Sequence, residues 1–143
     1  QWRQRLTGAC RLRVPLLPAL LLGAADPLEV AKRLDLPGQQ TKVLGQCRDL
    51  LAWLPEHTPP PGAPPSQWCR ALEGSGWSAE AVVLAVCHRP AEWRLLLRWW
   101  GRWRHVRSPL TAAELIDAGW SPGPRLGAEL SRLRLQRIDQ EGR

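Results

Sequence analysis

The segment 92–106 carries side chains that could bind phosphate groups. Arg94, Arg98 and Arg102 recur every fourth residue, so a helix here would place them on one face, about 6 Å apart along its axis. That step is close to the spacing of phosphates along a nucleic-acid strand, and a guanidinium donates two parallel hydrogen bonds to a phosphate. The pattern predicts a helix that follows a polynucleotide backbone without reading its bases. A solvated arginine face on an amphipathic helix is the alternative.

The other face of this predicted helix is apolar. Its residues at helical spacing, which we expect to pack in a core, are Trp93, Leu96, Leu97 and Trp100. Trp99 and Trp103 fall at the flank, where an indole ring would either stack on a base or sugar or pack between helices.

A second candidate phosphate site lies where the last helix is predicted to start. Gly123 precedes Pro124, which suits the first helical position, and Arg125 and Gly127 follow. A helix start without bulky side chains presents free N–H groups and the positive end of the helix dipole to an anion. Alternatively, the glycines only permit close packing of a tight turn.

The residues before this site predict a short helix with defined ends. Thr111 and Glu114 have the spacing of a capping box, and Gly119 stands where a left-handed residue would end the helix. The two segments together predict a C-terminal helix–turn–helix.

The same residues resemble a known family. The segment from 109 to 130 is similar to the C-terminal part of bacterial tRNA nucleotidyltransferases, the CCA-adding enzymes and their poly(A) polymerase relatives. The residues that match are Thr111, Leu115, Gly119, Pro122, Gly123, Pro124, Gly127 and Leu130. Ala112 and Glu114 replace the usual Gly and Asp of that family. The segment 16–45 also resembles the helical region that precedes this part in the family.

The resemblance implies a body and tail that hold the acceptor stem and T arm of tRNA. It also implies a catalytic head that adds C, C and A to the 3′ end with Mg²⁺, CTP and ATP. The family's Gly-Gly loop and paired carboxylates are not present, since the sequence contains no Gly-Gly, Asp-x-Asp or Glu-x-Asp. The sequence also contains no Met, so we expect a piece of a longer enzyme, inactive alone and without a cofactor of its own.

Composition indicates a cationic protein. The 143 residues carry a net charge of +7, which predicts a polyanionic partner. The longest apolar run, 14–25, contains Pro15 and Pro18 and is shorter than the ~20 residues that span a bilayer. Although arginines precede it as in a signal peptide, we expect a buried helix, no membrane contact and a cytoplasmic location.

We expect an all-α bundle of about seven helices in one or two small subdomains. Segment 1–54 would form a helical body, including a helix that Asp26 caps and another over about 39–53. The prolines of 55–66 predict an extended connector, or alternatively a ligand for a partner domain. Segment 67–143 would form the tail, with Ser66 and Ser78 as helix caps.

The four cysteines and three histidines lack the spacing of a zinc site or a catalytic pair. Cys47 and Cys87 fall on apolar helical faces, so we expect buried free thiols in a reducing cytosol. The sequence therefore predicts either the tRNA-binding part of a tRNA nucleotidyltransferase, or a basic protein-interaction or structural module with no RNA role.

Overall fold

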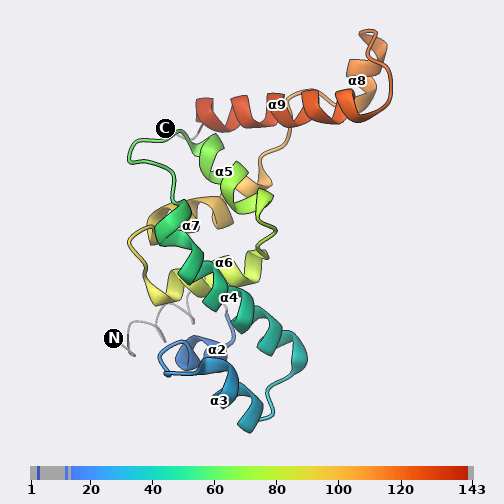
Figure 1. The fold of residues 1–143 in the computed structure, drawn as a ribbon. Coiled ribbons are helices and arrows are strands. Elements are labelled where there is room, and N and C mark those ends of the chain that lie inside the picture. The colour runs from blue at the N-terminus through green and yellow to red at the C-terminus, as the bar shows by residue number, and fades with distance from the viewer. Residues whose placement is uncertain (1–2, 4–11, 13, 142–143) are drawn as a thin grey trace.

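The prediction of an all-α fold is confirmed. A computed structural model describes Arg3, Leu12 and residues 14–141, and in that part of the chain all regular structure is helical (Figure 1). The eight α-helices found there exceed the expected number by one. The elements are α2 (Leu16–Leu21), α3 (Pro27–Arg33), α4 (Gly38–His57), α5 (Pro65–Gly74), α6 (Ala79–His88), α7 (Trp93–Gly101), the 3₁₀ turn η1 (Trp103–His105), α8 (Ala112–Asp117) and α9 (Pro124–Glu141).

Helix α6 forms the centre of the core. Every residue from Ala81 to Cys87 is buried, as expected of a helix that is apolar on all sides. Ser78 caps the start of α6 as predicted, since its Oγ accepts a hydrogen bond of 3.2 Å from the Ala81 N–H. Helices α4, α7 and α2 all pack against α6, so the core joins elements from both halves of the chain.

Helix α4 is longer than the sequence predicts. It runs to His57 rather than to about residue 53, and it includes Pro55 in its last turn. A proline there removes one helical hydrogen bond and crowds the carbonyl four residues earlier, yet the helix continues for two residues beyond it. The residues that α4 buries are Leu44, Cys47, Leu50 and Leu54, all in the same hydrophobic cluster as α6.

The proline-rich connector is shorter than predicted and is not extended throughout. It occupies residues 58–64, and within it the Ala63 N–H donates to the Pro60 carbonyl while Gly62 has a φ of +82°. This is a tight turn between prolines. Because α5 already starts at Pro65, Ser66 is not its cap. The Ser66 N–H instead donates to Asp139 Oδ1 of α9, at 2.8 Å.

Helix α8 has the ends that the sequence predicts. The Glu114 N–H donates to Thr111 Oγ1 at 3.3 Å and the Thr111 N–H donates to Glu114 Oε2 at 2.7 Å, which completes the capping box. The Thr111 N–H, and after it the Thr111 hydroxyl, which donates to the same Oε2 at 2.9 Å, lower the pKa of the exposed Glu114. At the other end, Gly119 has a φ of +101° and the Trp120 N–H bonds to the Leu115 carbonyl.

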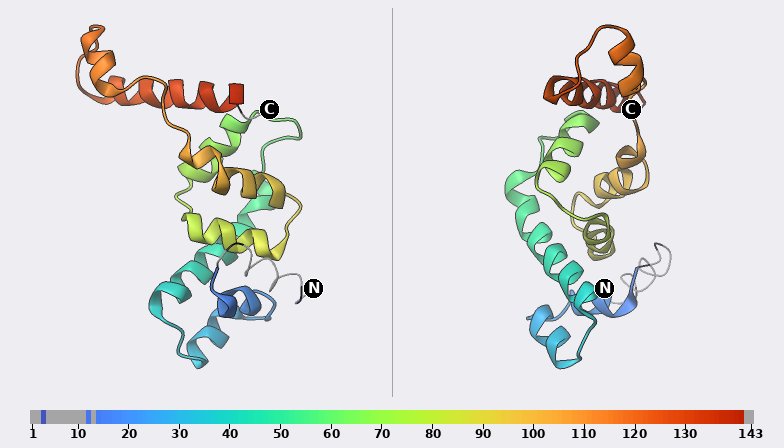
Figure 2. Two further views of the ribbon diagram at one scale, coloured as in Figure 1. Left: turned by 180° about the vertical axis from the view of Figure 1, so that it is seen from behind. Right: turned by 90° about the vertical axis from the view of Figure 1, so that its right-hand side faces the viewer.

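We call residues 112–131, which comprise α8, the turn after it and the first part of α9, the terminal arm. Figures 1 and 2 show α8 at one end of α9 and α5 beneath the other end. Leu115 and Leu126 are buried in the terminal arm, apart from the main hydrophobic cluster. The terminal arm therefore has a small apolar contact of its own, separate from the core of the body.

In the part of the chain that the structure describes, no helix combines the length and the apolar composition needed to cross a bilayer.

Candidate nucleic-acid interface

The helix that carries the predicted arginine face ends earlier than predicted. Helix α7 stops at Gly101, and Arg102 has a φ of −133° and a ψ of −64°, outside the helical range. Glycine is a poor helix former, and the chain continues from there as the short turn η1. The prediction of one helix over 92–106 is therefore wrong at its C-terminal end.

The structure places two of the three predicted arginines on α7 and the third just beyond it. Arg94, Arg98 and Arg102 are all exposed, but only Arg94 and Arg98 share a regular helical face. The Arg94 guanidinium lies 5.4 Å from the centre of the Trp93 ring, which holds it by a cation–π contact. The surface is thus shorter and more irregular than a helical stripe of three arginines.

The two tryptophans at the flank of α7 belong to the core. Trp99 is 4% exposed and Trp103 is 2% exposed, so neither ring offers a face to a base in this structure. Both side chains therefore pack between helices, which was the alternative to base stacking. The buried side of α7 is centred on Leu96 and Trp99, while Trp93, Leu97 and Trp100 are half-buried.

All the described ion pairs involve arginines outside segment 89–107, although Arg70 and Arg125 also have no described ion pair. On α3, α4 and α9 the pairs are Arg33–Glu29, Arg48–Asp49, Arg132–Glu129, Arg134–Glu73 and Arg137–Glu141. Segment 89–107 contains six arginines and a single carboxylate, Glu92. None of these six arginines forms an ion pair with any residue that the structure describes. We call this group, Arg89, Arg94, Arg98, Arg102, Arg104 and Arg107, the unpaired arginines.

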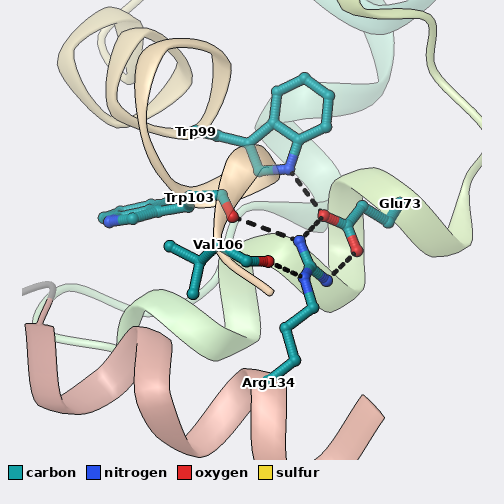
Figure 3. Close-up of polar contacts among 5 residues, drawn as sticks. All are labelled: Glu73, Trp99, Trp103, Val106 and Arg134. Atoms are coloured by element: carbon teal, nitrogen blue, oxygen red, sulfur yellow. Dashed lines mark hydrogen bonds and ion pairs between the residues drawn. The ribbon is translucent and has the colours of Figure 1, made fainter. Parts of the chain in front are cut away.

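A cluster around Arg134 joins α9 to the segment that carries the unpaired arginines. Arg134 forms a bidentate pair with Glu73 of α5, with two contacts of 2.8 Å, and Trp99 Nε1 donates to the same carboxylate at 3.2 Å (Figure 3). Arg134 also donates to the carbonyls of Trp103 and Val106, at 3.2 and 2.8 Å. The hydrogen bond to Glu73 raises the pKa of Arg134, so the guanidinium stays charged.

A hollow of about 580 Å³ lies between η1 and α9, and we call it the η1–α9 hollow. No carboxylate is among the described residues that line it. The side chains in its wall that can donate hydrogen bonds to a ligand are Arg104, His105, Arg107, Ser108 and Ser131, since Thr111 and Arg134 already donate to the carboxylates of Glu114 and Glu73. This composition suits an anion.

The second predicted phosphate site lies apart from α7. Gly123, Arg125 and Gly127 belong to the turn before α9 and to its first helical turn, at the end of the terminal arm where α8 lies (Figure 1). Pro124 is the first helical residue, as predicted. Gly123 and Arg125, but not Gly127, border a second hollow of about 720 Å³ over residues 118–125. The predicted phosphate residues therefore form two separate groups.

Alanine replacements at the two glycines of this site should have opposite effects on stability. Gly123 has a φ of +147°, which an L side chain rarely adopts, so Gly123→Ala should cost about 1 kcal/mol. Gly127 lies inside α9, and a Cβ added there would meet only open space, so Gly127→Ala should stabilise by about 0.5–1 kcal/mol. Amide hydrogen exchange of the terminal arm measures both effects. Equal shifts for the two variants would contradict the assigned turn.

Some residues of this interface were not predicted from the sequence. Arg104 and Arg107 belong to the same arginine-rich segment, so its local excess of charge could have indicated them. Arg134 gave no such signal, because its partner Glu73 is 61 residues away in the chain.

Among the described residues, no three His, Cys, Asp or Glu side chains gather in a group that could hold a metal ion. Comparisons with known proteins found no matching family model, no matching curated protein and no matching solved structure.

Proposed function

We propose that this chain binds the phosphate backbone of structured RNA, with tRNA as its substrate. The observation that supports this proposal is the set of unpaired arginines. An arginine that already has a carboxylate partner must give up that partner to bind a phosphate, whereas an unpaired one has no such partner to give up. Six arginines without a described carboxylate partner, within nineteen consecutive residues, are therefore ready to bind a polyanion.

The resemblance of residues 109–130 to the C-terminal part of tRNA nucleotidyltransferases makes the proposal more specific. In this more specific form the chain is the cytoplasmic body and tail of a tRNA nucleotidyltransferase, and it grips the acceptor stem and T arm. Nucleotide addition with Mg²⁺, CTP and ATP would belong to a catalytic head elsewhere in the parent enzyme. Arg94, Arg98 and Arg102 would bind phosphates along one stem, and the turn at Gly123, Arg125 and Gly127 would bind a phosphate farther along the same RNA.

Binding to a duplex RNA minihelix, measured from about 50 to 200 mM salt, tests the proposal. We expect affinity to fall steeply as salt rises, because each phosphate contact releases counterions. Replacing Arg94, Arg98 and Arg102 by alanine should reduce the slope of log affinity against log salt by about 0.9 for each lost contact.

A second triple variant provides a matched control. Arg33, Arg48 and Arg137 are ion-paired on α3, α4 and α9, and their replacement by alanine lowers the net charge by the same three units. We expect this variant to keep most of the slope of the original chain. If both triple variants lose slope equally, binding reflects net charge alone and the proposed interface is wrong.

A protein-interaction module is the second candidate. The terminal arm and the residues just before it expose three large apolar side chains, Leu110, Ile116 and Trp120, each at least 37% exposed, and such side chains often contact other proteins. Absence of RNA binding at the lowest salt would favour this second function.

A further inference from the structure

We propose that the η1–α9 hollow is a preformed seat for one phosphate of the bound RNA, with Arg104 and Arg107 as its ligands and Arg134 as the residue that positions them. This inference rests on the proposed function. It assigns phosphate binding to side chains outside both groups that the sequence predicted, and it gives a role to the one arginine cluster that joins α9 to the body among the described residues.

The wall of the η1–α9 hollow has the chemistry that a phosphate requires. A phosphodiester offers only hydrogen-bond acceptors and a negative charge, so it needs donors and cations around it. Arg104, His105 and Arg107 line one part of the hollow, and Ser131 of α9 lines another. The hollow, of about 580 Å³, is open to the surface, so a phosphate on a large RNA can reach it.

Arg104 and Arg107 differ in how they are held, and both are available to a ligand. The Arg104 guanidinium lies 5.6 Å from the centre of the Trp100 ring, and its Nε–H donates to the Trp100 carbonyl. Its terminal amino groups make no hydrogen bond that the structure describes, and the side chain borders both the η1–α9 hollow and a second hollow that Trp100 also lines. Arg107 is exposed and has no ion pair with any described residue. One ligand is therefore fixed in place and the other can close on the phosphate.

Arg134 fixes the backbone that carries these two ligands. The carbonyls to which it donates, those of Trp103 and Val106, lie on either side of Arg104 and His105 in the chain (Figure 3). A single 3₁₀ turn is weak without outside support, so a side chain from α9 that binds both carbonyls holds η1 in place. Because Glu73 already neutralises Arg134, we assign Arg134 to positioning rather than to phosphate binding.

An acidic protein segment would carry the same charge as a phosphate, but the surroundings favour RNA. Just before η1 in the chain, α7 carries two more unpaired arginines, Arg94 and Arg98, about 6 Å apart along the helix axis. That single spacing is close to the step between neighbouring phosphates of a polynucleotide. Competition by polyglutamate in the experiment below separates the two ligands.

The experiment measures binding of a duplex RNA minihelix as a function of salt for variants of the hollow. We expect R104A/R107A to reduce the slope of log affinity against log salt by roughly 0.9–1.8, which corresponds to one or two phosphate contacts. R104K/R107K keeps both charges on exposed or half-buried side chains, and it should restore most of that slope. Polyglutamate should compete much less effectively than unlabelled minihelix.

Arg134→Met tests the positioning role, with Arg132→Met as its matched control. Both replaced arginines lie on α9 and both are ion-paired, but Arg132 pairs with Glu129 of the same helix and makes no described contact with η1. We expect R134M to lower the slope about as much as R104A/R107A does, and to add little when combined with it. It should also speed amide exchange at residues 103–107 without RNA. R132M should leave both measurements unchanged.

Four results would overturn these assignments in different ways. If the unmodified chain does not bind the minihelix at low salt, the proposed function and the seat both fail. If it binds and only R94A/R98A/R102A weakens binding, the function stands and the seat is wrong. If R134M matches R132M in both slope and exchange, Arg134 has no positioning role. If polyglutamate competes as well as RNA does, the hollow binds acidic protein instead.

Discussion

Replacing Trp103 by alanine is expected to lower the free energy of unfolding by about 3–5 kcal/mol. The side chain is 2% exposed and is the largest one that the described core buries fully. Its removal would leave a cavity in a packed region where α5, α7 and η1 meet, and the neighbours could fill it only in part. Chemical denaturation, followed by far-ultraviolet circular dichroism, measures the loss.

Trp120→Ala is the control for this prediction. Trp120 is 37% exposed at the terminal arm, so its truncation should cost no more than about 1 kcal/mol. Similar losses for the two variants would show that Trp103 is not a core residue. A Trp103→Ala variant of normal stability but with weakened RNA binding would instead support base stacking, which the burial of this residue argues against.

The three described cysteines should resist alkylation by several orders of magnitude in the folded chain. Cys47, Cys69 and Cys87 are all buried. Burial raises the pKa of Cys69 to about 12 and that of Cys87 to about 11, from an ordinary value of 9.0. Burial first, and then the nearby Cys87, raises the pKa of Cys47 further. Since the thiolate is the reactive form, both low ionisation and lack of access slow the reaction.

Iodoacetamide labelling of a Cys10→Ser variant measures this resistance, because it removes the one cysteine outside the described residues. Labelling at pH 8 should proceed only as fast as the chain unfolds. Raised pKa values also favour the folded state below pH 9, and this contribution is lost as the pH rises from about 9 toward 12. We therefore expect labelling to accelerate in that range by more than the ionisation of an ordinary thiol would explain. Immediate labelling of any of the three thiols at pH 8 would contradict their burial.

Features that depend on neighbouring residues were predictable from the sequence. The capping box of Thr111 and Glu114, the left-handed Gly119 and the cap of α6 by Ser78 all form hydrogen bonds within a few residues. Such patterns fix local geometry whatever the rest of the fold does, so the residue types alone indicate them.

Features that depend on distant residues were not predictable. Ser66 looks like a helix cap, but Asp139 of α9 binds the start of α5 in its place. Arg134 and Glu73 are likewise brought together only by the packing of α5 and α9. A single sequence contains no signal for these pairs.

The candidate site combines both kinds of feature. The excess of arginine in segment 89–107 was visible in the sequence, because a single carboxylate, Glu92, accompanies six arginines there. The four-residue spacing of the arginines predicted that Arg102 shares a helical face with Arg94 and Arg98. This was wrong, because the helix stops at Gly101. The helical periodicity also placed Trp99 and Trp103 at a flank, although contacts with other helices bury both.

The way in which α9 is attached to the body has a mechanical consequence. Among the described residues, the side-chain hydrogen bonds from α9 to the body are made by Arg134 and Asp139. The helix from Pro124 to Arg134, about 15 Å long, extends beyond them. A tilt of roughly 5° about this anchor would move the α8 end by only about 1.3 Å, while the core stays still. The angle of α9 at this anchor therefore sets the distance between the Gly123 turn and the arginines of α7.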